Sequence, residues 1–183
     1  MKHIRLLSIF VLTVAFLSAC GSGSAQSEWK VYHAKKGSLV NPNFPAYSFE
    51  YPSTWTLDEA ANHIAFASES KLLKSAPDQL KPGQIVAGLS LNADTSPEDL
   101  VNGYATSLGD VIQFGEPLSF IMNGHPAVYQ EGTDSKTGDQ LLILAVDMGA
   151  NTRGLLTAAI AAGDLEVQKD TLMKMAQSLQ VEE

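Results

Sequence analysis

Histidine is the first side chain to consider, because His33, His63 and His125 all lie well inside the chain. A zinc site needs three or four ligands, and two of them are often histidines at close spacing, as in H-E-x-x-H. The three histidines are widely separated and have no such neighbours. We therefore predict no metal site and expect each histidine on the surface or at a strand edge. His125, beside Asn123-Gly124, is the best placed for a pH-sensitive contact.

Nucleophile elbows and phosphate loops are absent from the sequence, which contains no G-x-S-x-G, no G-x-x-x-x-G-K-[ST] and no G-x-G-x-x-G. Asp134, Gly138 and Asp139 suggest calcium, but the acid spacing and distal Glu of an EF-hand are missing. A turn between two strands is the favoured interpretation of that segment. With no acid, base and nucleophile set, we predict no catalytic residues, no cofactor-binding residues and no enzymatic activity.

Cys20, the single cysteine, follows a basic start and the apolar run 6–17. That run is too short for a membrane-spanning helix, which needs about 20 residues, and is typical of a signal peptide. Leu17-Ser18-Ala19-Cys20 resembles a bacterial lipobox. The resemblance implies that residues 1–19 are removed and that Cys20 carries lipid, including an acyl chain such as palmitate on the new amino terminus. Two or three acyl chains anchor a protein stably. The alternative is an ordinary secreted protein with a cysteine near its start.

The net charge of the chain limits the classes of partner that it can bind. It has 12 basic and 20 acidic residues, a formal net charge of −8, and loss of Lys2 and Arg5 with the signal peptide makes it more negative. An acidic domain repels phosphate backbones, so we predict no nucleic-acid partner. The small polar segment 20–28 is expected to be a flexible tether, and 29–183 one domain close to the membrane. The expected location is the extracytoplasmic face of the cell membrane or outer membrane.

Hydrophobic periodicity predicts an α+β domain. Residues 47–51 and 85–91 alternate as strands do, and Ser96-Pro97-Glu98-Asp99 has the cap, proline and acids that begin a helix. Asn123-Gly124 favours a tight hairpin turn. We expect strands at 29–33, 47–51, 63–68, 85–91, 114–122, 125–132, 140–148 and 154–162, helices at 96–109 and 164–180, and a loop or single helical turn in 70–82.

Aromatic residues are concentrated between Trp29 and Phe66. An exposed aromatic cluster would stack on sugars or hold an apolar ligand. The period-two alternation favours a buried strand face instead, with Trp29 and Phe44 as the best candidates for exposed exceptions. The sequence leaves open whether this aromatic-rich third, or the lysine-containing segment Ser70–Pro82, forms a binding surface.

A family resemblance rests on four signals in order: Tyr47-Ser48-Phe49-Glu50-Tyr51-Pro52 with Trp55, the helix start at Ser96, Ile121 to Ala127, and the final Ser178-Leu179. Their order and spacing resemble the PsbP-like family (the Mog, PsbP, DcrB and LpqN type) over residues 29–181. The resemblance implies an α/β/α sandwich, an antiparallel sheet flanked by helices. It also implies a binding or assembly role without a shared catalytic site.

Two functions are therefore expected. The leading hypothesis is a non-catalytic envelope lipoprotein, anchored at Cys20, whose PsbP-like domain binds or helps assemble another envelope component, with a protein as its partner. The alternative is a small-molecule or glycan receptor associated with a transporter. A hydrolase is the least favoured, since no catalytic set can be assembled from the sequence.

Overall fold

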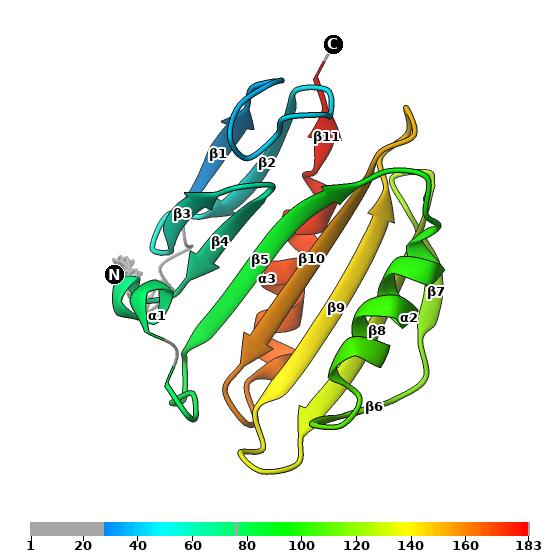
Figure 1. Cartoon of the computed structure of the whole chain (residues 1–183). Coiled ribbons are helices and arrows are strands. Elements are labelled where there is room, and N and C mark those ends of the chain that lie inside the picture. Colours follow the sequence, from blue (N-terminus) through cyan, green and yellow to red (C-terminus); the bar gives the residue numbers. More distant parts are fainter. Residues whose placement is uncertain (1–27, 76, 183) are drawn as a thin grey trace, which may run out of the picture.

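An antiparallel sheet of eight strands forms the middle layer of the computed structural model, which describes residues 28–75 and 77–182 (Figure 1). The strand order is β3-β4-β5-β10-β9-β8-β6, and β7 pairs with β8 beside β6. These strands are β3 (Thr56–Ala60), β4 (His63–Ala67), β5 (Ile85–Asn92), β6 (Ile112–Phe114), β7 (Leu118–Met122), β8 (His125–Asp134), β9 (Gln140–Asp147) and β10 (Arg153–Ile160).

A second, three-stranded sheet has the order β1-β2-β11. It consists of β1 (Trp29–Ala34), β2 (Tyr47–Pro52) and β11 (Gln180–Val181), so elements from the two ends of the domain flank one strand. Three helices complete the fold: α1 (Ser70–Lys74), α2 (Pro97–Leu108) and α3 (Leu165–Gln177). The predicted α+β class and antiparallel sheet with helices on its faces are confirmed, whereas this second sheet was not predicted.

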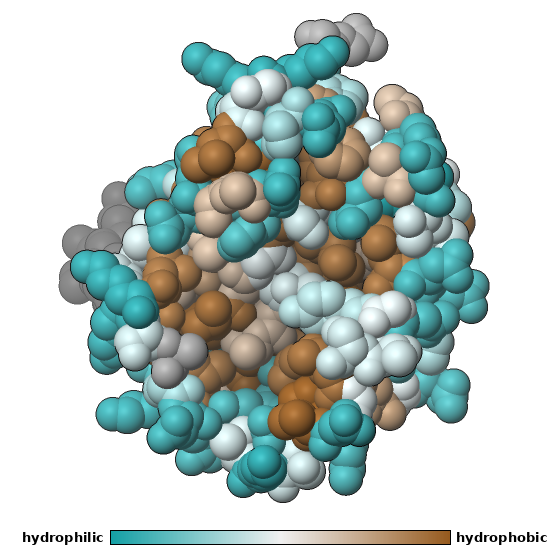
Figure 2. Space-filling view, in the orientation of Figure 1, coloured by the Kyte–Doolittle hydropathy of each residue, from teal (hydrophilic) through white to brown (hydrophobic). Residues whose placement is uncertain are grey.

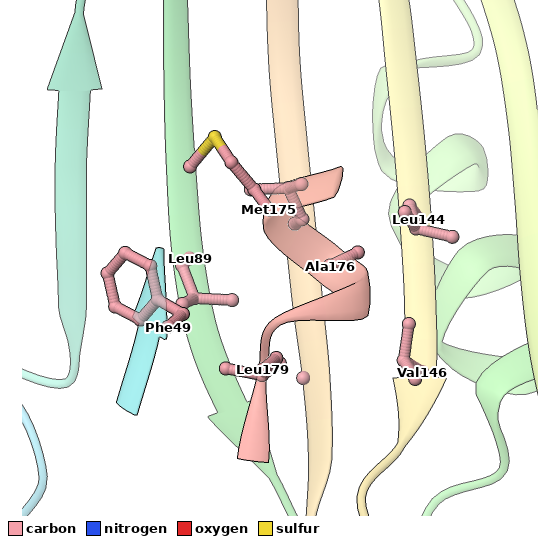
Figure 3. A pocket seen from close by; sticks show the side chains of 9 residues that line it. Phe49, Leu89, Leu144, Val146, Met175, Ala176 and Leu179 are labelled. Carbon is pink, nitrogen blue, oxygen red and sulfur yellow. The ribbon is translucent and has the colours of Figure 1, made fainter. Parts of the chain in front are cut away.

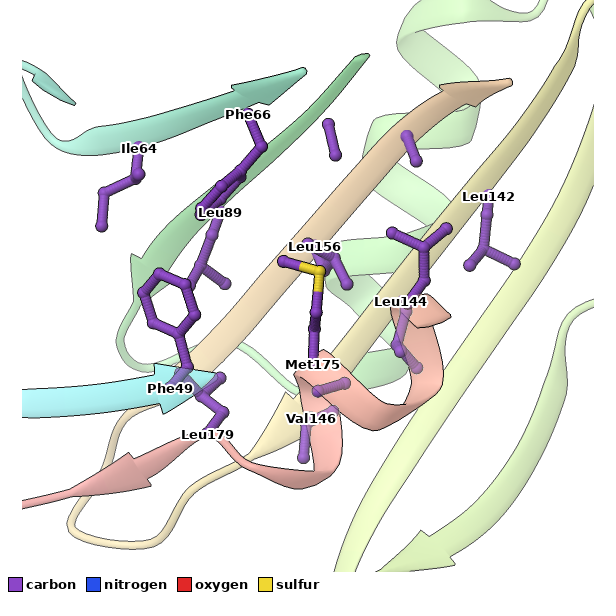
Figure 4. Packing of buried hydrophobic residues seen from close by; sticks show 14 of the residues in the cluster. Phe49, Ile64, Phe66, Leu89, Leu142, Leu144, Val146, Leu156, Met175 and Leu179 are labelled. Carbon is purple, nitrogen blue, oxygen red and sulfur yellow. The ribbon is translucent and has the colours of Figure 1, made fainter. Parts of the chain in front are cut away.

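The main core lies between the large sheet and a layer shared by α3 and the small sheet (Figure 4). Side chains from one face of the central strands, such as Leu89, Leu144 and Leu156, meet Phe49 of β2 and Met175 of α3. We call this side of the large sheet its inner face. A smaller cluster on the outer face joins Val101 and Ala105 of α2 to the intervening positions of β8, β9 and β10. Because both faces of β9 are buried, its sequence is a nearly continuous apolar run.

The start of α2 follows the predicted capping pattern. Ser96 Oγ accepts a hydrogen bond from Asp99 N at 3.1 Å, and the same hydroxyl donates to Asp99 Oδ2 at 2.7 Å. Pro97 occupies the first turn, where its missing N–H leaves no helical bond unmade. Asn123 and Gly124 both have positive φ, as the predicted hairpin turn requires.

The prediction of one strand over 114–122 is wrong. The structure has β6 up to Phe114 and β7 from Leu118, with both strands pairing to β8. The interruption has a local cause, because Pro117 has no N–H to donate to a sheet ladder. Gly115 N still donates to Glu131 O at 2.9 Å, after which the chain leaves the sheet and returns as β7.

Two other strands were missed. β3 has the sequence TLDEA, which contains little of the β-branched and aromatic character that favours strands. β11 is only two residues long and depends on its pairing with β2. The predicted helix over 164–180 therefore ends earlier, at Gln177.

Candidate functional site

The three histidines lie apart in the structure. His33 Nδ1 is 2.5 Å from Glu182 Oε1, and this hydrogen bond is the main reason that the pKa of the Glu182 carboxyl is lowered. His63 Nδ1 contacts the Ala61 carbonyl oxygen at 3.2 Å, and His125 begins β8. Within residues 28–75 and 77–182, no group of three or more His, Cys, Asp and Glu side chains is placed to hold a metal ion.

The carboxylates at 134 and 139 stabilise loops. Asp134 Oδ1 accepts hydrogen bonds from the amides of Lys136 and Thr137 at 2.7 and 3.1 Å, which lowers the pKa of its carboxyl. Asp139 is almost fully buried, and its Oδ2 accepts a bond from Leu80 N at 3.0 Å. The turn favoured by the sequence is therefore present, and Asp139 links this turn to the segment that follows α1.

Cys20 and the signal-peptide residues 1–19 lie outside the described residues, as does most of the expected tether. Within the part of the chain that the structure describes, no helix is long and apolar enough to cross a membrane. Lipid attachment at Cys20 accordingly stays a prediction from the sequence.

The aromatic-rich third is part of the core. Tyr47, Phe49 and Phe66 are each 1% exposed or less, and the rings of Phe49 and Phe66 meet edge to face with centroids 5.4 Å apart. Trp29 is half-buried beneath Lys174, whose Nζ lies 3.9 Å from the ring centroid. The interpretation of these residues as a buried strand face is confirmed. Neither Trp29 nor Phe44 is fully exposed.

A void inside the core is too small to serve as a binding site. It lies between α3 and the sheet, is lined by Phe49, Leu89, Met175 and Leu179 among others, and has room for about 10 Å³ (Figure 3). That volume is about the space of a single water molecule, and the lining is almost entirely apolar. The interior of the domain thus offers no ligand cavity here, and candidate binding sites are on its surface.

A cleft of about 610 Å³ opens on the outer face, between the start of α2 and the β7–β8 hairpin. We call it the α2–β7 cleft; it is lined by Ser96, Pro97, Glu98, Ser119, Phe120, Ile121, Pro126, Ala127, Val128, Asp147 and Arg153. Its lining is mainly apolar, and Ile121 is 67% exposed. This size and composition are typical of ligand pockets and of protein-binding grooves.

The polar part of the cleft is held by a short network. Arg153 Nη1 donates to Asn151 Oδ1 at 2.7 Å, and Asn151 Nδ2 donates to Asp94 Oδ1 at 2.6 Å. Arg153 Nη2 is 3.7 Å from Asp147 Oδ2, while Asp147 Oδ1 accepts a bond from Gly149 N. Arg153 is therefore the single basic residue in a network with Asp94 and Asp147, and Glu98 also lines the cleft, so its polar part carries a net negative charge beside the apolar wall.

β7 forms the outer wall of the α2–β7 cleft and is an edge strand. Among the described residues, it pairs with β8 alone, so its second backbone edge is free to accept another strand. Leu118, at the other end of β7 from the hairpin turn, is 53% exposed. Exposed apolar side chains on an unpaired edge are a recognised basis for protein association.

A second depression, of about 300 Å³, lies on the other side of α2, over β4, β5 and β10. Its floor consists of small residues such as Ala65, Gly88, Thr157 and Ala159, and Tyr104 of α2 lies at its border. Figure 2 shows this outer face with brown apolar surface interrupted by polar residues and bordered by hydrophilic ones. α2 is thus flanked by hollowed surface on both sides.

Sequence reasoning did not find the α2–β7 cleft. Ser96, the hairpin residues Ile121 and Pro126, and Arg153 come from three separate segments, and only the fold brings them together. The one available signal was Ile121, an apolar residue directly before Met122 and the polar turn. The hairpin pattern predicts the turn but not the exposure of Ile121.

The fold that these elements define is an α+β fold of the PsbP-like type. In a search of solved structures, cyanobacterial PsbP (CyanoP) from Synechocystis sp. PCC 6803 aligns with a TM-score of 0.56 and 13% identity, over 91% of this chain and 99% of that one. LpqN of Mycobacterium tuberculosis, described as involved in cell envelope biogenesis, aligns with a TM-score of 0.51 and 18% identity, over 85% and 92%. No protein-family model and no curated protein sequence matches. At these identities the likeness shows the shared fold.

Proposed function

We propose that the protein is a non-catalytic lipoprotein of the cell envelope, anchored through Cys20, whose PsbP-like domain binds another envelope component, a protein, through the α2–β7 cleft. The observation that carries the proposal is the cleft itself, an apolar surface next to a free strand edge. The envelope setting is supported by the lipobox-like Leu17 to Cys20 and by the described role of the LpqN structure.

Site-specific photo-crosslinking in intact membranes tests the binding surface. A photoreactive amino acid at Ile121 should give a discrete covalent adduct with a partner, because this side chain projects 67% exposed at the cleft. The matched control is Val167 on α3, which is also apolar and is 72% exposed, but is not part of the cleft. Equal adducts at both positions, or none at Ile121, would count against the cleft.

A charged variant then separates binding from folding. Ile121→Asp should abolish the adduct formed by a photoreactive group at neighbouring Ser119, while leaving the melting temperature within about 2 °C. The small stability effect is expected because an exposed substitution typically changes the free energy of unfolding by no more than about 0.5 kcal/mol. A large fall in melting temperature would show that Ile121 has a structural role instead.

The anchor has its own test, which does not depend on the cleft. Mass spectrometry of the membrane-extracted protein should show a chain that begins at Cys20 and carries a diacylglyceryl group. Cys20→Ala should move the protein from the membrane fraction to the soluble fraction. An unmodified thiol on a membrane-free protein would refute the anchor and leave the binding proposal standing.

A small-molecule or glycan receptor is the second candidate, favoured by the volume of the cleft, which falls within the range of ordinary ligand pockets. Thermal-shift screening distinguishes the two functions. A ligand present at 100 times its Kd stabilises the folded state by about 2.7 kcal/mol. A ligand that raises the melting temperature of the parent but not of Ile121→Asp would establish the receptor.

A further inference from the structure

The turn between β7 and β8 fixes which backbone groups of β7 point toward β8. The loop 123–124 has two residues, with φ of 52° and 82°, so Met122 and His125, which flank it, form a hydrogen-bonded pair. Along an antiparallel ladder such pairs alternate with pairs that exchange no hydrogen bonds. Ile121 and Pro126 form the next pair and are of the second kind, in agreement with the missing N–H of Pro126.

The backbone N–H and C=O groups of Ser119 and Ile121 consequently point away from β8. Within residues 28–75 and 77–182, no strand pairs with that side of β7, which lies at the border of the large sheet (Figure 1). The two residues therefore offer two N–H donors and two C=O acceptors to a neighbouring chain. Pro117, the preceding residue of the same phase, has no N–H, so the open ladder ends there.

β7 is also the edge strand with the least protection against pairing. Proteins commonly protect exposed edges with charged side chains or by keeping the edge strand very short. Among the edge strands that the structure describes, β3 carries Asp58 and Glu59, and β1 carries Lys30. β6 and β11 have only three and two residues. β7 has five residues, LSFIM, and no charge, so it is the edge best suited to pairing with another strand.

The side chains of β7 offer apolar contacts on both faces of such a strand. Ile121 is 67% exposed on the outer face, beside the α2–β7 cleft. Leu118 is 53% exposed and has the same phase as Phe120, which packs against the main core on the inner face. A residue directly opposite Ile121 in an added strand would have its Cβ about 4.5–5.5 Å from the Ile121 Cβ. Apolar residues in the added strand would therefore cover both exposed side chains.

The surroundings of β7 are acidic. Glu116 is exposed just before the strand, and Glu98 and Asp147 line the cleft, where Arg153 is the one basic residue of the lining. Like charges brought together across an interface are unfavourable, so a segment that contains Asp or Glu is disfavoured here and one with Lys or Arg is favoured. A second copy of this chain is disfavoured for the same reason, because its formal net charge is −8.

We propose that β7 binds an extended segment of the partner protein as an additional strand of the large sheet. The segment is apolar next to Ile121 and Leu118 and carries lysine or arginine in place of acidic residues. This inference rests on the proposed function and adds the way in which the partner is bound. Main-chain hydrogen bonds to Ser119 and Ile121 supply affinity, and the side chains beside them select the sequence.

A pair of variants at position 119 tests the backbone contact, with the full-length protein in membranes and a photoreactive group at Ile121. Ser119→Pro removes an N–H that points away from β8, so the hairpin should be retained. Ser119→Ala loses the same hydroxyl and keeps the N–H. The adduct yield should be at least about tenfold lower in Ser119→Pro than in Ser119→Ala, because a carbonyl of the partner is left without its donor.

The outcomes of this comparison separate the two proposals. Equal yields in Ser119→Pro and Ser119→Ala would overturn strand addition and leave binding through the α2–β7 cleft standing. No adduct in the chain with an unchanged Ser119 would refute the binding surface itself, and strand addition with it.

Hydrogen exchange decides the matter even if the proline disturbs the hairpin. In the free protein, the amides of Phe120 and Met122 should be protected by β8, whereas those of Ser119 and Ile121 should exchange rapidly. In the purified adduct, the Ser119 amide should exchange at least about tenfold more slowly, while the amides of β3, on the opposite edge of the sheet, should not change. A Ser119 amide that is protected in the free protein, or still exchanges rapidly in the adduct, would overturn the proposal.

Mass spectrometry of the digested adduct identifies the segment that is bound. We expect the crosslink to lie in a stretch with apolar residues next to the crosslinked position and without Asp or Glu. A crosslink to an acidic stretch, or to a second copy of this chain, would contradict the proposed partner.

Discussion

Gly154 of β10 should not tolerate alanine, although its backbone conformation permits one. A Cβ at this position would overlap Leu179 Cδ2 and would lie 3.7 Å from Leu179 Cγ. Leu179 lies against the sheet just after α3 (Figure 3). It cannot easily move away, because it is 8% exposed in the main core and the next residue, Gln180, is paired with Ser48. The small residue lets the end of α3 approach the sheet closely.

The expected cost of Gly154→Ala is about 1–2 kcal/mol in the free energy of unfolding. Overpacking a close-packed core by one methyl costs about 1–3 kcal/mol, and the reduced entropy of the unfolded chain returns about 0.4–1 kcal/mol. For a domain of this size, each kcal/mol lowers the melting temperature by about 2–4 °C.

A second background makes the test decisive. Leu179→Ala alone should cost about 2–5 kcal/mol, because it leaves a cavity over Gly154. In that background, Gly154→Ala should become stabilising by about 1 kcal/mol, since the new methyl fills part of the cavity. The sign of the effect therefore reverses, and the coupling between the two positions amounts to about 2–3 kcal/mol.

Urea unfolding followed by tryptophan fluorescence measures all four chains of this cycle. Gly103→Ala in α2 is the control, because nothing lies within 4 Å of the added Cβ apart from its chain neighbours and the backbone of its own helix. Removing a glycine from a helix interior should stabilise the protein by about 0.5–1 kcal/mol. If Gly154→Ala stabilises the parent as Gly103→Ala does, or has the same effect in both backgrounds, the contact with Leu179 does not limit the packing.

Three other predictions concern titration, capping and a buried carboxylate. Burial raises the pKa of Tyr47 to about 12, above the value near 10 of an unfolded tyrosine, so stability present below pH 10 should fall as the pH rises toward 12. Tyr47→Phe should reduce that fall in denaturant titrations at alkaline pH, and an unchanged pH slope would contradict the reasoning. Ser96→Ala removes the α2 cap and should cost about 1 kcal/mol in urea unfolding. Ser107→Ala, whose hydroxyl donates to a carbonyl of its own helix, should cost much less, and equal losses would refute the capping role. Asp139→Ala removes the acceptor of the Leu80 amide and should cost about 1–3 kcal/mol, with faster hydrogen exchange at that amide. Unchanged exchange would show that other contacts hold this segment.

The central strands could be predicted because the pattern of apolar residues in their sequences matches the buried positions of a strand. β5 and β9 are apolar on one or both faces, and α2 begins with an unambiguous cap. β3 and β11 could not be predicted in this way. Their few residues have weak strand preference, and they are strands because β4 and β2 offer edges to them. The sequence of such a segment does not show that a distant strand will pair with it.

The surface sites were hidden for a related reason. Ile121 and Pro126 belong to one hairpin, yet their neighbours in the cleft, Ser96 and Arg153, come from distant segments. The exposure of a residue likewise depends on whether another segment of the chain packs over it. In β1, Val31 is 54% exposed while Tyr32 packs against the core. The alternating pattern of this strand does not show which of its two faces is buried.

Strand β2 receives its second neighbour only after every other strand and helix of the domain has been translated. Ser48 and Gln180, which face each other in the small sheet, are 132 positions apart, so the open edge of β2 waits while nearly the whole domain is translated. Until β11 emerges, that edge can pair with any extended chain nearby, and a holding chaperone would protect it. If the protein is exported unfolded, the small sheet can close only on the far side of the membrane, after Gln180 and Val181 have crossed.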